Sequence, residues 1–223
     1  MTPRTIAIDG PSGSGKSTVG ELLAKRLGYL YFDTGVMYRA VTCVALQRAL
    51  NVADEAQISE LAERLQIGVL PPTVADGRQN TVLADGKDIT NMLRSPEIDA
   101  NVSSVASYAR VRAAMVRQQR AIGERGRVVM IGRDIGTVVL PHSELKVYLT
   151  AAVEERARRR QRENAERGDG TSYEDVLHMM RRRDEKDMGR ENSPLRPAAD
   201  AHQIDSERSP AAEIVDSIER LWT

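Results

Sequence analysis

The sequence predicts an α/β fold built around a parallel sheet, and three observations support this prediction. Residues 5–8 form a β-branched apolar run that is typical of a buried strand. After a glycine-rich loop, Val19, Leu23 and Leu27 recur at the three- and four-residue steps of one helical face. Residues 128–131 are apolar without alternation, as in a strand that is covered on both faces. Strands that alternate with helices in this way favour a parallel sheet.

The composition excludes several classes of protein. The 223 residues include 32 Lys and Arg and 32 Asp and Glu, so no overall field attracts nucleic acid or a membrane. The aromatic content of 4% argues against a base-stacking surface. The single cysteine, Cys43, excludes an intramolecular disulfide framework, and no apolar run is long enough to span a bilayer. We expect a cytoplasmic monomer that has neither nucleic acid nor a membrane as a partner.

The first half of the chain continues the alternation and then departs from it. Residues 29–32 predict a strand, about 36–50 a helix, and Asp54 can cap a further helix. Brief strands over 67–70, over 81–83 and ending at Ile89 follow, separated by the turn pairs Asp76-Gly77 and Asp85-Gly86. We therefore expect a small antiparallel sheet inserted at about 67–90.

The second half predicts more strands and helices. Ser95-Pro96 opens a helical stretch that reaches about Ile122 and is broken near Tyr108. The later elements are a strand at 146–149, a charged helical pair over 151–192, a strand at 203–205, and a final helix capped by Ser209-Pro210 that buries Ile214, Val215, Ile218 and Leu221.

The loop over residues 10–17 predicts a nucleoside triphosphate site. Its sequence, Gly-Pro-Ser-Gly-Ser-Gly-Lys-Ser, fits G-x-x-x-x-G-K-[ST] at each fixed position, between a strand and a helix. Lys16 can reach the β- and γ-phosphates of ATP, and the Ser17 hydroxyl can bind Mg²⁺. The predicted ATP-binding residues are Gly10, Pro11, Ser12, Gly13, Ser14, Gly15, Lys16, Ser17 and Thr18.

Two further motifs begin where predicted strands end, which is where ligands gather in open α/β sheets. In the first, Thr34 and Gly35 can approach a phosphate and Arg39 can bind it bidentately, although a capped helix with a surface arginine would look the same. In the second, Arg133 can neutralise phosphate charge and Asp134 can accept from a ligand, although the two could instead form a structural ion pair.

The stretch from Glu154 to Arg196 is rich in arginine. Interleaved acidic residues indicate that most of it is a solvated helix surface with ion pairs one turn apart. Some of the arginines can form a lid, because phosphoryl transfer needs charge neutralisation and exclusion of water.

Five motifs in this order resemble those of bacterial cytidylate kinases over essentially the whole chain: 10–17, Asp33-Thr34-Gly35-x-x-Tyr38-Arg39, Arg110-Val111-Arg112, 132–139 (Gly-Arg-Asp-Ile-Gly-Thr-Val-Val), and Arg183-Asp184-x-x-Asp187. The resemblance implies a three-layer P-loop fold with a five-stranded parallel core sheet, an inserted nucleoside-monophosphate (NMP) domain and a helical lid. The corresponding ranges are 1–35, 125–152 and 196–223 for the core, 36–124 for the NMP-binding domain, and 153–195 for the lid.

The resemblance also implies roles for individual residues. It places the acceptor phosphate near Thr34, Arg39 and Arg133, the cytosine near Ser103, Arg112 and Asp134, and the ribose near Arg183 and Asp187. Lys16, Arg133, Arg156, Arg159 and Arg190 would act on the phosphates during catalysis. Asp33 is a further candidate for Mg²⁺, through water.

The chemistry of the base favours cytosine, because a carboxylate accepts from its N4 amino group whereas uracil presents an acceptor there. The expected reaction is therefore phosphoryl transfer from ATP to CMP or dCMP. The alternatives are a kinase for another small acceptor such as UMP, AMP or shikimate, a regulatory GTP-binding switch, and an RNA-binding module. The switch lacks an N-K-x-D guanine-reading motif in this sequence, and the RNA-binding module would require steeply salt-dependent affinity.

Overall fold

The computed structural model describes residues 1–166 and 168–222. The strands are β1 (Thr5–Asp9), β2 (Leu30–Asp33), β3 (Ile67–Leu70), β4 (Thr81–Ala84), β5 (Lys87–Asp88), β6 (Val128–Gly132), β7 (Leu145–Thr150) and β8 (His202–Asp205). The α-helices are α1 (Lys16–Leu27), α2 (Gly35–Gln47), α3 (Glu55–Arg64), α4 (Pro96–Val105), α5 (Ala109–Gly123), α6 (Val153–Glu166), α7 (Tyr173–Met188) and α8 (Ala211–Glu219). Among the described residues, no helix is long and apolar enough to cross a membrane.

The main sheet has five strands in the order β2-β6-β1-β7-β8. Strand β7 pairs in parallel with β1, where Ile6 lies opposite Leu145, and with β8, where Val147 lies opposite His202. The apolar run of β6 is almost completely buried, as its lack of alternation predicts. The predicted α/β class with a parallel core sheet is confirmed.

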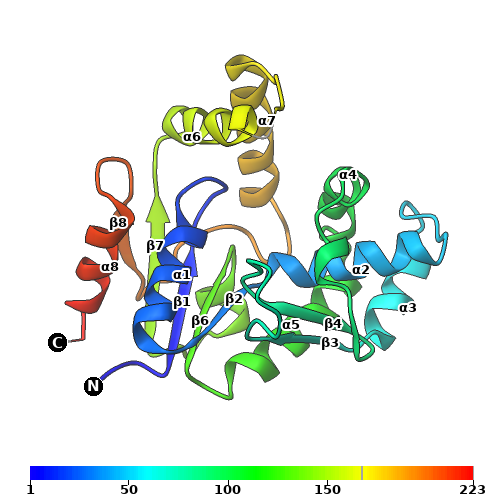
Figure 1. Ribbon diagram of the computed structural model, residues 1–223, viewed down its shortest axis with the longest axis horizontal. Coiled ribbons are helices and arrows are strands. Elements are labelled where there is room, and N and C mark those ends of the chain that lie inside the picture. Colours follow the sequence, from blue (N-terminus) through cyan, green and yellow to red (C-terminus); the bar gives the residue numbers. More distant parts are fainter. Residues whose placement is uncertain (167, 223) are drawn as a thin grey trace. The chain divides into compact units, whose positions relative to one another are not determined.

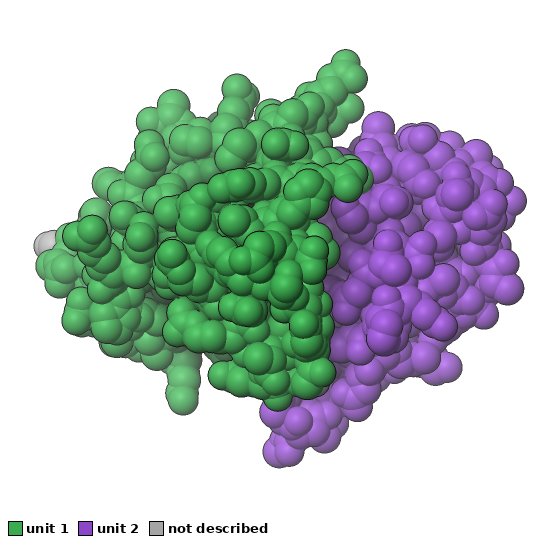
Figure 2. Space-filling model, turned by 90° about the horizontal axis from the view of Figure 1, so that it is seen from above, with its two compact units in different colours: residues 1–29, 129–223 green, residues 30–128 purple. Residues whose placement is uncertain are grey.

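The chain forms two compact units, residues 1–29 with 129–223 and residues 30–128 (Figure 2). In the first unit, α1 packs against α8, and α6 lies beside α7 (Figure 1). In the second unit, α2 packs against α4 and α3 against α5, next to the antiparallel sheet β3-β4-β5. The division into core, NMP-binding domain and lid stays a prediction.

Several predicted helix ends are confirmed by their caps. The Asp54 carboxylate accepts from the backbone N–H of Gln57, and the Ser95 hydroxyl accepts from that of Ile98. The helical stretch after Pro96 is interrupted as expected, because Tyr108 has extended backbone between α4 and α5.

Three predictions about helix ends are wrong. Helix α2 ends at Gln47 rather than near Leu50, because Ala49 turns the chain with a left-handed φ of 51°. Pro210, which has no side-chain oxygen, takes the N-cap position of α8, so Ser209-Pro210 provides no side-chain cap. Helix α8 ends at Glu219, and Leu221 beyond it is 38% exposed instead of buried.

The inserted sheet over 67–88 is confirmed, and only one of the two turn pairs closes a tight hairpin. Asp85 and Gly86 join β4 to β5 with φ angles of 48° and 80°, the left-handed pair of a type I′ turn. Asp76-Gly77 lies instead in the longer connection between β3 and β4.

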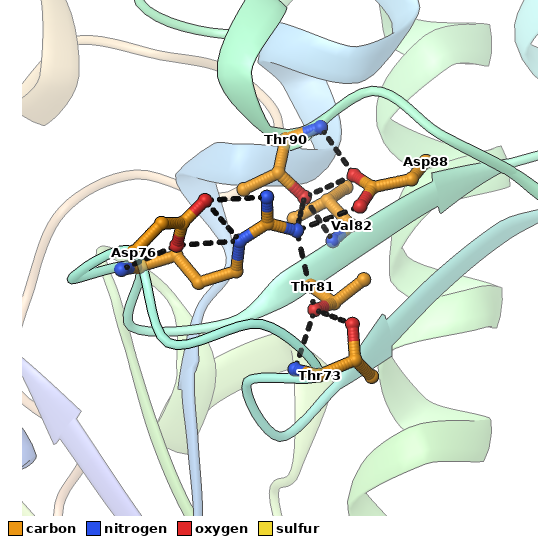
Figure 3. Close-up of polar contacts among 7 residues, drawn as sticks. Thr73, Asp76, Thr81, Val82, Asp88 and Thr90 are labelled. Carbon is orange, nitrogen blue, oxygen red and sulfur yellow. Dashed lines mark hydrogen bonds and ion pairs between the residues drawn. The ribbon is translucent and has the colours of Figure 1, made fainter.

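A polar network fastens this longer connection to the end of the insert (Figure 3). Arg78 donates to both carboxylate oxygens of Asp76 and, at 2.6 Å, to Asp88. Hydrogen bonds from Thr90, and then from Arg78, lower the pKa of Asp88 to about 2. The side chain of Arg78 is only 8% exposed, whereas its partners Asp76 and Asp88 are more open to solvent.

We expect Arg78→Leu to lower the thermal unfolding midpoint by roughly 4 °C or more, because two carboxylates then lose their shared partner. Arg110→Leu is the matched control, since Arg110 also pairs bidentately with one carboxylate, Glu63, but is half-exposed. Circular dichroism measures both midpoints, and equal shifts would contradict a special role for the Arg78 network.

Candidate functional site

The glycine-rich loop between β1 and α1 has a backbone that its glycines make possible. A Cβ at Gly10 would lie 2.1 Å from the carbonyl oxygen of Leu149 in β7, so no larger residue fits. Gly13 and Gly15 have φ angles of 77° and 83°, in the left-handed region that favours glycine. The loop can therefore turn its amide groups inward in front of the N-terminus of α1, an arrangement that binds anions.

Lys16 is the first residue of α1, and its ammonium group lies against the loop. The Nζ atom donates to the carbonyl oxygen of Pro11 at 2.6 Å and lies 3.4 Å from the Ser14 hydroxyl. Its side chain is buried, whereas Ser17 and Thr18 in the same helical turn are exposed. A positive charge and a hydroxyl group thus lie at one helix end, as the P-loop motif predicts.

Arg156, at the start of α6, holds the loop from outside. Its guanidinium donates to the carbonyl oxygens of Ser12 and Ala151 at 3.0 and 2.9 Å, and to both carboxylate oxygens of Asp184 in α7. Arg156 is 4% exposed, so this predicted lid arginine is a buried clamp between the loop and two helices.

Ser206 and Arg159 support the same loop from another direction. The Ser206 hydroxyl donates to the carbonyl oxygen of Ser14 at 2.9 Å. Arg159 donates to the carbonyl oxygens of Ser206 and Glu207, at 2.7 and 3.2 Å. The segment that follows β8 is therefore part of the wall around the loop, and the sequence analysis did not include it.

Three of the predicted phosphate and ribose residues are in contact with one another: the Asp187 carboxylate binds the guanidinium groups of Arg133 and Arg190. Asp187 in α7 accepts from Arg133, which follows β6, at 3.1 Å and also from Arg190. The Asp187 side chain is 4% exposed. Arg183 lies on the same helix but is exposed. A buried carboxylate thus orients two guanidinium groups that can bind phosphate.

Asp9 is a buried carboxylate that the sequence analysis missed. It is the last residue of β1, and it accepts from the backbone N–H groups of Ile135 and Gly136 at 2.8 and 2.7 Å. Burial, opposed by these two bonds, raises its pKa to about 6, and the negative charge of Asp134 acts in the same direction as burial. A carboxylate directly before Gly10, at the end of an apolar strand, was the signal available in the sequence.

Asp134 lies at the start of a short π-helical turn over Ile135–Val139. Its backbone carbonyl accepts from the N–H groups of Val138 and Val139. Asp134 is 6% exposed, and its side chain makes no capping hydrogen bond to the turn. The predicted base-reading residue is therefore buried, and its backbone is held by the hydrogen bonds of the turn.

The predicted acceptor-phosphate residues of the second unit lie at the start of α2. Thr34 is buried at the N-cap position, and the Asp33 carboxylate accepts from the N–H of Gly35 at 2.9 Å. Arg39, one turn into α2, donates to Asp99 in α4 and to the carbonyl oxygen of Leu93. The Asp99 carboxylate and the Leu93 carbonyl therefore orient the Arg39 guanidinium.

The predicted base-binding residues of the second unit, Arg112 and Ser103, differ in burial. Arg112 of α5 is 6% exposed, lies 5.5 Å from the ring centre of Tyr38, and donates to the carbonyl oxygen of Ala106. Ser103 lies exposed on α4. The Arg112 guanidinium therefore makes a cation–π contact with Tyr38.

No group of three or more His, Cys, Asp or Glu side chains among the described residues could hold a metal ion. Mg²⁺ commonly binds through one or two protein ligands together with substrate phosphates. The predicted pair Ser17 and Asp33 offers the oxygen ligands that Mg²⁺ prefers. The exposed Ser17 at the N-terminus of α1 fits such a ligand.

We expect the buried Asp9 to reduce stability as pH rises. Its pKa of about 6 lies above the ordinary aspartate value of 3.8, so between these two pH values the folded chain holds a proton that the unfolded chain has lost. Relative to Asp9→Asn, the wild-type free energy of unfolding should fall by about 2 kcal/mol from pH 4 to pH 7. Urea unfolding across this range measures it, and parallel pH profiles of the two proteins would contradict it.

Comparisons with known proteins identify the family. The cytidylate kinase family model matches residues 6–223. The cytidylate kinase of Herpetosiphon aurantiacus is 54% identical over 97% of this chain and 93% of its own length. The cytidylate kinase of Bacillus subtilis is 46% identical over 96% and 94%. The shikimate kinase of Acinetobacter baumannii shares the fold, with a TM-score of 0.51 at 18% identity over 99% and 93%. With a family match across nearly its whole length, the chain belongs to the cytidylate kinase family.

Proposed function

We propose that the protein transfers the γ-phosphoryl group of ATP to CMP or dCMP and forms CDP or dCDP. The observation that carries this proposal is the arrangement of the first unit. A buried lysine at the phosphate-binding loop, and a pair between Arg133 after β6 and Asp187 in α7, occur in one chain of the cytidylate kinase family. The alternative, another small acceptor such as UMP, has no feature that favours it.

The reaction needs positioning and charge neutralisation more than proton transfer. The nucleophile is an acceptor phosphate oxygen, which is already ionised at neutral pH, so no general base is required. Lys16 and the amides of the loop would hold the β- and γ-phosphates of ATP. Arg133 and Arg190, oriented by Asp187, would neutralise the charge that spreads over the transferred group.

The proposed acceptor contacts are those that the sequence motifs predict. Thr34, Arg39 and Arg133 would bind its phosphate, and Arg183 and Asp187 its ribose. Ser103, Arg112 and Asp134 would bind the base, with the Asp134 carboxylate accepting from the N4 amino group. UMP would place an acceptor against that carboxylate, at a cost of about 1–3 kcal/mol for each unpaired group.

Ser17 would hold Mg²⁺, with Asp33 as a further candidate through water, and the ion would supply charge neutralisation at the β- and γ-phosphates. The Ser17 hydroxyl contributes an oxygen ligand at a helix N-terminus, where the ATP phosphates are expected.

The proposed function is tested by ADP release with ATP and Mg²⁺ and each of CMP, dCMP, UMP, AMP, shikimate or no acceptor. We expect CMP and dCMP to exceed UMP at least tenfold in kcat/KM. Asp134→Ala should remove most of this preference, and Lys16→Ala should lower turnover at least a hundredfold. Lys25→Ala, a surface lysine of the same helix, is the control. Equal rates with UMP would reject the base assignment, and no acceptor-dependent release would reject the kinase.

The buried position of Arg156 predicts a loss of ATP affinity on substitution. Arg156→Lys cannot keep the contacts to Ser12, Ala151 and Asp184 together, so the loop should loosen and the KM for ATP should rise about tenfold. Arg158→Lys is the matched control, since Arg158 lies exposed on the same helix. A lower kcat with unchanged KM for ATP would instead indicate direct action on the transferred phosphoryl group.

A further inference from the structure

Asp9 is a buried, titratable group to which the proposed reaction gives no role. It lies directly before the phosphate-binding loop and is 3% exposed. Both of its carboxylate oxygens are used, one for the N–H of Ile135 and the other for that of Gly136. These two residues follow Asp134, so the contact joins the end of β1 to the residues after the predicted base reader.

The two N–H groups belong to the first turn of the helical segment over 135–139. Such groups have no partner within their own helix and need an acceptor from elsewhere. In most helices the residue that precedes the first turn supplies that acceptor from its own side chain. Here that residue is Asp134, whose side chain makes no capping bond, and Asp9 caps the turn in its place.

The consequence concerns the chemistry of Asp134. A carboxylate used for capping would point back at its own turn, and its oxygens would be engaged by backbone N–H groups. Asp9 satisfies those two N–H groups, so the turn does not need the Asp134 side chain as its cap. The same bonds hold the backbone that follows Asp134 against the end of β1.

Close packing leaves this arrangement little freedom. A Cβ added at Gly136 would lie 3.4 Å from an Asp9 carboxylate oxygen and 3.1 Å from the side chain of Lys146. Lys146 is itself held by Asp200 and by the carbonyl oxygen of Pro141. The turn therefore packs closely against both Asp9 and a lysine that is itself held in place.

We propose that Asp9 is a positioning residue for base selection, which caps the turn over 135–139 in place of Asp134 and so fixes the backbone that carries the base reader. This inference rests on the proposed function, because it assigns to Asp9 an effect on the choice between CMP and UMP.

The test compares kcat/KM for CMP and UMP in wild type, Asp9→Asn, Asp9→Ala, Asp134→Ala and the double variant Asp9→Ala/Asp134→Ala. We expect the CMP/UMP ratio to fall about tenfold in Asp9→Ala and less in Asp9→Asn, which keeps one acceptor oxygen. In the double variant the ratio should equal that of Asp134→Ala, because Asp9 acts through Asp134. Asp9→Asn decides the question if Asp9→Ala does not fold.

Val215→Ala, a cavity-forming change in the buried face of α8, controls for loss of stability alone and should leave the ratio unchanged. Hydrogen exchange gives a readout without activity, and the amides of Ile135 and Gly136 should exchange faster in both Asp9 variants. An unchanged ratio in the Asp9 variants, or an equal fall in Val215→Ala, would overturn the inference. A wild-type chain without preference for CMP would instead overturn the proposed function, which the wild-type measurement shows by itself.

Discussion

The phosphate-binding loop depends on contacts that reach it from distant parts of the chain. Its glycines permit the tight backbone, but they also make it flexible, since glycine has the largest conformational freedom in the unfolded chain. Arg156 and Ser206 fasten the carbonyl oxygens of Ser12 and Ser14, and Lys16 fastens that of Pro11. The amide groups on the other side of the same peptides are thereby held in a fixed orientation.

Carboxylates that orient arginines are a second common feature of the two units. Asp187 holds Arg133 and Arg190, Asp184 holds Arg156, and Asp99 holds Arg39. A free arginine side chain has many rotamers, and fixing it only when the ligand arrives would reduce affinity. Paired in advance, a guanidinium can present its remaining donors at little entropic cost.

The two sheets are stabilised by different means. The main sheet has buried apolar strands such as β6, so hydrophobic burial dominates there. The small sheet β3-β4-β5 has a two-residue edge strand whose residues are exposed. Apolar side chains such as Val69 and Val82 are buried there too, and the long connection is held in addition by the polar network of Arg78, Asp76 and Asp88. Such a network adds a specific geometry to hydrophobic burial.

The sequence alone determined the class of the fold, the phosphate-binding loop, the inserted hairpins and the helix caps at Asp54 and Ser95. These features depend on local periodicity, on glycine and proline, and on side chains that bond to their own turn. Tertiary structure decided the rest. The sequence predicts Arg156 as a lid arginine that acts on the phosphates, and only folding buries it against Ser12 and Asp184. Asp9 reads as the end of a strand, and its bonds to residues 135 and 136 join positions far apart in the chain. Local sequence contains no signal for such a pairing. The carboxylate needs these hydrogen bonds only because folding buries it, and its partners come from a distant segment.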